Sequence, residues 1–282
     1  MKIQTLIMIT IQASIFMTVF SFGLNSSLDD ILYVVRRPSL LARSLLSMNI
    51  IMPLFAAVII TLFDFHPAVK IALVALAVSP VPPLLPQREL KAAGTASYAY
   101  GLLFTAALIA IVYVPLAIEL LSRFFDVPAH MPPAAVARLV LITVLAPLSI
   151  GIAVRHYASA LAGRIAKPVL MVALVVLGVS ILPLLVVLFP SVMSLIGNGT
   201  IIVIVAFVLV GLASGHLLGG PEPDDRTILA LSTAIRHPAV AMAIASANYP
   251  GEKLVPAAVL LYLILNVVVS IPYLIWRRRR TA

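Results

Sequence analysis

The chain contains no cysteine and few charged residues, and both absences exclude whole classes of function. Without cysteine there is no disulfide framework, no thiol nucleophile and no thiolate metal site. Only 10% of the residues are charged, whereas soluble domains carry about 25%, and 62% are hydrophobic. The sequence therefore predicts an all-α, polytopic membrane protein. Gly/Ser-rich linkers are also missing, so we expect one transmembrane domain over residues 1–282.

The formal net charge of +9 comes from basic residues that cluster at the ends of apolar segments. Anionic lipid headgroups and membrane topology explain this placement better than a nucleic-acid partner does. We therefore expect the lipid bilayer as a partner and no nucleic acid.

Hydropathy predicts nine transmembrane helices. The first is interpreted as a retained span and not a signal peptide, because it lacks a basic start and a small-residue cleavage site. The polar stretch 25–37 is too short to span and predicts an amphipathic connector, in which Asn25-Ser26-Ser27 caps a short helix with Asp29 and Asp30 in its first turn. The predicted spans are 2–22, 38–62, 67–93, 95–122, 133–154, 166–189, 199–219, 226–249 and 253–276.

The loop charges predict the orientation of the nine spans. One set of loops and the C-terminal tail holds thirteen Lys and Arg residues, including the run Arg277–Arg280, and the other set holds five. The positive-inside rule then places the N-terminus outside and the C-terminus in the cytoplasm of a plasma membrane, which we expect to be a bacterial inner membrane. The arginine run is interpreted as a lipid-facing stop anchor.

The stretch 226–249, RTILALSTAIRHPAVAMAIASANY, carries the most unusual residues of the chain. Pro238 cannot donate the helical hydrogen bond, so it predicts a helix break within the membrane. Arg236 at that depth is costly unless a partner or a cavity meets it. Further candidate site residues lie close to it in the sequence: His237, Ser232 and Thr233. We interpret this break as a candidate binding site for a small organic anion.

The third span repeats the pattern. Pro80, Pro82 and Pro83 follow an apolar run directly after Ser79, and a continuous helix cannot hold three prolines within four residues. Gln87 beyond this break, Ser79 beside it and Tyr98 in the next span are weaker candidates for lining a path. Each hydroxyl among them could equally bond to its own helix.

Two interrupted spans in a nine-span chain suggest an inverted repeat of four and five helices. The matching parts would be about 1–122 and 133–276, with the opening helix of the first half missing. Paired broken helices in inverted halves are a sequence pointer to a transporter site near the bilayer midplane.

The stretch FSFGLNSSLDDILYVVRRP, the following IMPL, then AVSPVPP, LKAAG and AVAMAIASANY resemble the bile acid:sodium symporter family and its wider superfamily of organic-anion and arsenite carriers. The resemblance covers nearly the whole chain through loose motifs. It implies a panel domain and a core domain, in which the two broken helices cross. The arsenite carriers are disfavoured because their usual thiol is absent from this chain.

The departures from the family are concentrated at its sodium ligands. The family's Glu-x-Gly-x-Gln-Asn before the second break aligns with Ser232, Arg236 and His237 at its polar positions. Its Thr-Ala-Ser-Asn after the first break aligns with residues 82–85, Pro-Pro-Leu-Leu. Sodium needs several oxygen ligands and is repelled by a guanidinium, so no sodium site, other metal or cofactor is expected.

The leading hypothesis is a secondary transporter or facilitator of a small organic anion that works by alternating access without sodium. Arg236 would replace the bound cation at the crossing, either holding the broken helices together or offering a bidentate fork to a carboxylate. The other interpretation is that Arg236 only pairs with backbone carbonyls at the break. His237 is a candidate for coupling transport to protons.

Two other classes remain as alternatives. One is a sodium:organic-anion symporter with relocated ligands, and the other is a receptor or accessory protein that no longer transports. An enzyme is not expected, because no paired acid and base or metal cluster is found. The sequence does not identify the substrate, the direction of transport or the oligomeric state.

Overall fold

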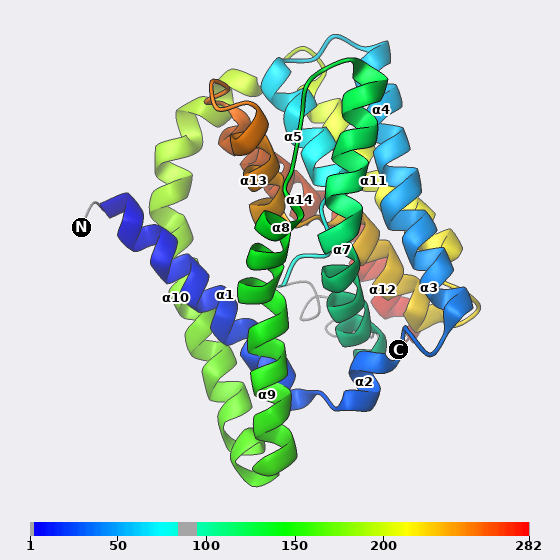
Figure 1. The fold of residues 1–282 in the computed structure, drawn as a ribbon, viewed down its shortest axis with the longest axis vertical. Coiled ribbons are helices and arrows are strands. Elements are labelled where there is room, and N and C mark those ends of the chain that lie inside the picture. The colour runs from blue at the N-terminus through cyan, green and yellow to red at the C-terminus, as the bar shows by residue number, and fades with distance from the viewer. Residues whose placement is uncertain (1–2, 84–94, 282) are drawn as a thin grey trace.

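The computed structural model describes residues 3–83 and 95–281, and these residues form helices and loops without a strand. Figure 1 shows the helices running mostly along the long axis of the molecule. The helical elements are α1 (Ile3–Asn25), α2 (Leu28–Leu32), α3 (Pro38–Leu45), η1 (Leu46–Ile51), α4 (Met52–Leu62), α5 (Pro67–Val78), α7 (Ala96–Phe125), α8 (Pro133–Val140), η2 (Leu141–Leu145), α9 (Ala146–Tyr157), α10 (Ser159–Leu195), α11 (Thr200–Leu218), α12 (Pro223–Ala234), α13 (Pro238–Asn248) and α14 (Val255–Thr281).

Eight helical stretches in the described part of the chain are long and apolar enough to cross a membrane. The predicted third span is represented there by α5, which has 12 residues and is too short to be counted among the eight. The loop 63–66 lies at one end of the bundle, which we call the Asp64 end, and α2 lies at the other, the Asp30 end (Figure 1). Since α5 starts at the Asp64 end and α7 at the Asp30 end, the chain passes between the two ends from His66 to Thr95.

The ends of most predicted spans agree with the structure to within a few residues. The second runs over Pro38–Leu62, as hydropathy predicts, although its middle is the π-helical segment η1. The sixth differs, because α10 extends over Ser159–Leu195 where 166–189 was predicted. Hydropathy detects only the strongly apolar part of a helix, and Arg164 and Lys167 lower the hydropathy of the first turns of α10. Three prolines lie inside α10, which membrane helices tolerate when neighbouring groups satisfy the freed backbone.

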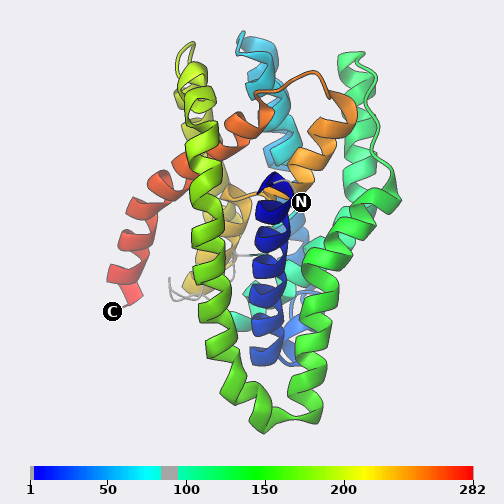
Figure 2. The same ribbon diagram turned by 90° about the vertical axis from the view of Figure 1, so that its left-hand side faces the viewer.

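Helices α1, α9 and α10 pack together as one group. Figure 2 shows α1 lying between the other two. Gly23 of α1 and Gly151 of α9 bring the two backbones together: a Cβ atom built on Gly23 would lie 2.3 Å from the carbonyl oxygen of Leu148. On its other side, α1 donates hydrogen bonds to α10 backbone carbonyls, from Ser14 Oγ to Ala173 O at 2.5 Å and from Ser21 Oγ to Ala166 O at 2.8 Å. Small residues thus permit the close approach that membrane helices use in place of a hydrophobic driving force.

The second group contains the helices from α3 to α5, together with α7 and α11 to α14. Gly211 and Gly215 of α11 face α12 so closely that a Cβ on Gly211 would lie 2.6 Å from the Cα of Ala234. Gly211 and Gly215 therefore form a surface on α11 against which α12 packs. Most of the buried apolar side chains of the molecule belong to this group.

The connector α2 links the two groups at the Asp30 end and has the predicted cap. Ser27 Oγ accepts a hydrogen bond from the Asp30 backbone N–H, and the Asp30 carboxylate accepts one from the Ser27 N–H at 2.7 Å. Ser97 at the start of α7 donates to the same carboxylate at 2.5 Å. Burial raises the pKa of Asp30, but these hydrogen bonds outweigh it and lower the pKa below its ordinary value.

Arg277 is buried in the structure, whereas the sequence predicts that it faces lipid with the rest of the arginine run. Its side chain is 4% exposed, and its guanidinium donates to Thr227 Oγ1 and to the Pro223 carbonyl, both at 2.6 Å. Arg277 faces the first turn of α12, where polar partners are available, while Arg278 and Arg279 on the neighbouring helix faces are exposed. A consecutive run of charges on a helix cannot share one environment, because successive residues point in different directions.

We expect Gly23→Ala and Gly178→Ala to change stability in opposite directions. A methyl group at Gly23 clashes with α9 backbone and should lower the free energy of unfolding by about 1–3 kcal/mol. Nothing lies within 4 Å of a Cβ on Gly178 in α10, so there the substitution should be neutral or stabilising, by up to about 1 kcal/mol. Thermal unfolding of the two purified variants measures this. Equal midpoints would contradict the close α1–α9 contact.

Candidate functional site

The two helix breaks touch each other. After α5 the chain leaves the helix at 79–83, and between α12 and α13 it does so at 235–237. The backbone N–H of His237 donates to the carbonyl of Pro80 at 2.9 Å, which joins the breaks directly. The prolines determine where this happens, since Pro80, Pro82 and Pro83 exclude a continuing helix and Pro238 occupies the first turn of α13.

Arg236 lies at this junction and is 1% exposed. Its Nη1 donates to the carbonyl of Ser79 at 3.2 Å, and its Nη2 donates to the carbonyls of Ala77 at 3.0 Å and of Met48. Ala77 and Ser79 are at the C-terminal end of α5, where carbonyl groups lack helical partners and the helix dipole is negative. The guanidinium of Arg236, at the second break, therefore caps the C-terminal end of α5, the half-helix that precedes the first break.

The third of these carbonyls belongs to the π-helical segment η1 within the second span. A π turn disturbs the regular i→i−4 pattern and is frequent at functional sites. Two adjacent carbonyls of η1 accept hydrogen bonds from other parts of the chain: Met48 accepts from Arg236 at the second break, and Asn49 accepts from the Tyr113 hydroxyl of α7 at 2.7 Å. The irregular segment thereby exposes acceptors to the junction.

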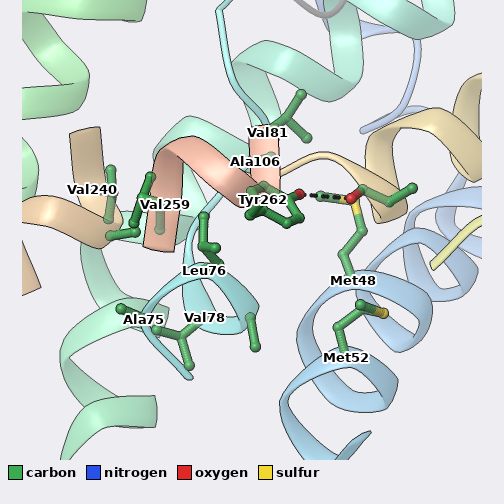
Figure 3. Packing of buried hydrophobic residues seen from close by; sticks show 14 of the residues in the cluster. Met48, Met52, Ala75, Leu76, Val78, Val81, Ala106, Val240, Val259 and Tyr262 are labelled. Carbon is green, nitrogen blue, oxygen red and sulfur yellow. Dashed lines mark hydrogen bonds between the residues drawn. The ribbon is translucent and has the colours of Figure 1, made fainter. Parts of the chain in front are cut away.

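The C-terminal end of α12 is capped from α14. The Tyr262 hydroxyl and the Asn266 amide both donate to the carbonyl of Ala234, at 2.7 and 2.9 Å. Figure 3 shows Tyr262 among Leu76 and Val81 of the first broken segment and Val259 of its own helix, with a dashed hydrogen bond from its hydroxyl to the carbonyl of Ala234. Asn266 thus bonds across helices, from α14 to α12.

Several polar atoms at the junction have no partner among the described residues. Both ring nitrogens of His237 are buried without a hydrogen bond, as is Nε of Arg236, and His237 is 1% exposed. The carboxylates in the described part of the chain form no ion pair with Arg236. Buried polar groups are normally satisfied, so these unpartnered groups beside a buried cation are the ones at the junction that a bound water or anion would contact.

Most of the other predicted site residues form hydrogen bonds with their own or a neighbouring helix. Ser79 Oγ donates back to the Ala75 carbonyl at 2.6 Å, which is the alternative stated for such hydroxyls. Thr233 bonds Ser47 of η1 at 2.8 Å, and Tyr98 bonds Ser44 of α3 at 2.9 Å. Ser232 is buried beside them in α12. Gln87 lies outside the described residues.

Sequence reasoning missed three residues of the junction. Tyr113 and Tyr262 were detectable in principle, since a hydroxyl in an apolar span needs a partner. Met48 was not, because it contributes its backbone carbonyl and its side chain gives no signal of this.

The fold and the junction define a class of protein: a helical membrane protein with two broken helices in contact, an arrangement typical of secondary transporters. A model of the sodium bile acid symporter family matches residues 13–208. The chain belongs to this family and is a membrane protein of that transporter type. The match contains the first break and ends before the second, so Arg236 lies beyond it. No curated protein matches the chain.

Arg236→Ala should lower the free energy of unfolding by about 3 kcal/mol, because buried carbonyls of α5 and η1 lose a charged donor. Arg138→Ala is the matched control. Arg138 is exposed, so its replacement should change the free energy of unfolding by less than about 1 kcal/mol. Thermal unfolding in one detergent compares them. Similar midpoints for the two variants would show that the junction does not depend on the guanidinium.

Proposed function

We propose that this protein is a secondary transporter or facilitator of a small organic anion, with Arg236 as a built-in cation in place of sodium. The observation that carries the proposal is the set of three backbone carbonyls around the guanidinium. In transporters with broken helices, unwound carbonyls and half-helix C-terminal ends are the groups that coordinate Na⁺. Here a side chain of the protein already donates to such groups.

The charge balance supports an anion as the substrate. Arg236 contributes a buried positive charge, and the first turn of α13 begins directly after it, with its dipole positive at that end. The guanidinium's two terminal nitrogens donate to carbonyls, so a bidentate grip on a carboxylate would require these bonds to exchange. The unpartnered groups, Nε of Arg236 and the imidazole of His237, are available without that exchange. We infer that they contact the anion.

The remaining features of the proposal concern topology and coupling. Nine crossings in an inverted four-plus-five repeat fit the passage of the chain between the two ends from His66 to Thr95. The N-terminus would then be outside and the C-terminus cytoplasmic in a bacterial inner membrane. His237 would couple transport to protons, being buried next to the guanidinium.

A ligand panel tests the substrate class. We expect one or more carboxylates, offered in increasing size from acetate to a steroid carboxylate, to raise the unfolding midpoint equally in sodium and in potassium at matched ionic strength. The same compound should enter proteoliposomes with saturable kinetics. An inward proton gradient should accelerate this uptake in the wild type and not in His237→Gln.

Each alternative gives a different result in these measurements. Stabilisation by sodium itself would favour a symporter with relocated ligands. Saturable binding without flux would favour a receptor or accessory protein. Uptake under a proton gradient tests only the role of His237. Uptake that does not depend on pH would contradict that role and leave the rest of the proposal unchanged.

A cation-rescue experiment tests the built-in cation. In Arg236→Ala the three carbonyls are left without a donor, so the variant should gain stability from Na⁺ or guanidinium, whereas the wild type should not. Choline at equal concentration is the control for ionic strength. Destabilisation that neither cation relieves would mean that the carbonyls do not form a cation site.

A further inference from the structure

A cavity of about 320 Å³ lies near the Asp64 end, away from Arg236 and His237. Four helices line it: α4, α5, the C-terminal part of α7, and α13. It therefore lies between the two half-helices that lead from the breaks toward the Asp64 end. Nothing in the junction described above uses it.

The cavity is apolar in its depth and has one cation near its mouth. Helix directions give the depth, because α5 runs away from the Asp64 end while α7 and α13 run toward it. The deep residues are Val74 and Ala75 of α5, Ile118 of α7 and Ile244 of α13. Lys70 lies one turn nearer the end than Val74, and it is the one charged residue among the described lining residues.

Two other polar side chains at the mouth, Ser122 and Asn248, have partners that hold the loop 126–132. Ser122 Oγ donates to the Val127 carbonyl at 2.7 Å and accepts from the Ala129 N–H at 3.1 Å. Asn248 accepts from the His130 N–H at 2.6 Å. They shape the rim, and Lys70 remains as the group that can recognise a charge.

The present partner of Lys70 is replaceable. Its Nζ lies 2.8 Å from Asp64 Oδ1, but the Asp64 side chain is fully exposed, while that of Lys70 is 31% exposed. Ion pairs with a solvated partner contribute little stability. A ligand carboxylate that adds burial of an apolar chain would compete well with Asp64 for the ammonium group.

We propose that this cavity is a second binding site, for a single-chain anionic amphiphile such as a free medium-chain carboxylate. Its carboxylate contacts Lys70 and its chain lies along Val74, Ile118 and Ile244. A cavity of roughly 150 Å³ holds benzene, so this one has space for a chain of about ten carbons. That volume suits one chain and not the two chains of a phospholipid. The inference does not depend on the function proposed for the junction.

The test measures binding of decanoate by titration calorimetry and by thermal shift, with the full-length protein in zwitterionic nanodiscs. Decanoate should bind and raise the midpoint, while decyltrimethylammonium, with the same chain and the opposite charge, should not. Lys70→Gln should weaken decanoate binding about tenfold. Val74→Phe, which fills the cavity while retaining an apolar helix, should abolish binding. Lys253→Gln is the matched control, an exposed lysine at the same end that does not line the cavity.

The arms of the experiment separate this site from the junction and from lipid. Decanoate binding should persist in Arg236→Lys, and its loss there with retention in Lys70→Gln would place the ligand at the junction and overturn the proposal. Unchanged affinity in both Lys70→Gln and Val74→Phe would likewise overturn it. Dioctanoyl phosphatidylglycerol should fail to displace decanoate, and full displacement would make the occupant a phospholipid chain.

Discussion

The buried guanidinium of Arg236 is the interaction on which the centre of this structure depends. A positive charge that is almost entirely removed from solvent in an apolar bundle is tolerated only where acceptors surround it. Those acceptors come from two separate stretches of chain: the end of α5, with Ala77 and Ser79, and the π-helical segment of the second span, with Met48. Both helix breaks and the π segment supply backbone groups that a regular helix would have used internally. The irregularities are thus mutually dependent.

The packing around this centre divides into two groups with different physics. Helices α1, α9 and α10 pack through glycine contacts and serine hydroxyls that donate to backbone carbonyls. The group around Arg236 combines a large apolar core with capped half-helices, since Ala234 at the end of α12 receives both Tyr262 and Asn266. Because the capping side chains come from α14 as well as from the breaks, polar contacts in this group join the ends of broken helices, whereas those of the first group join continuous helices.

Much of the fold was predictable because hydropathy and proline positions report directly on membrane spans and helix breaks. The second span was predicted with the bounds observed, and Pro238 and Pro80 identified both breaks. The extent of α10 was not predictable, since Arg164 and Lys167 lower the hydropathy of its first turns and its three internal prolines argue for interruptions that are absent. Of the site, Arg236 and His237 stood out as costly residues in an apolar span. Their partners did not, because the carbonyls of Met48, Ala77 and Ser79 belong to every residue alike and are distinguished only by the tertiary structure.

One consequence follows from the covalent attachment of Arg236 to the chain. An ion that binds and dissociates in each cycle carries charge across the bilayer and can draw work from its own gradient. A guanidinium fixed to the backbone returns with the protein and has no gradient to dissipate. In a carrier with such a charge at its centre, net movement of solute must be driven by the solute's own gradient, by the membrane potential acting on a charged solute, or by a coupled proton. Under the proposed function, the chain would exchange an energy source for a permanent counter-charge.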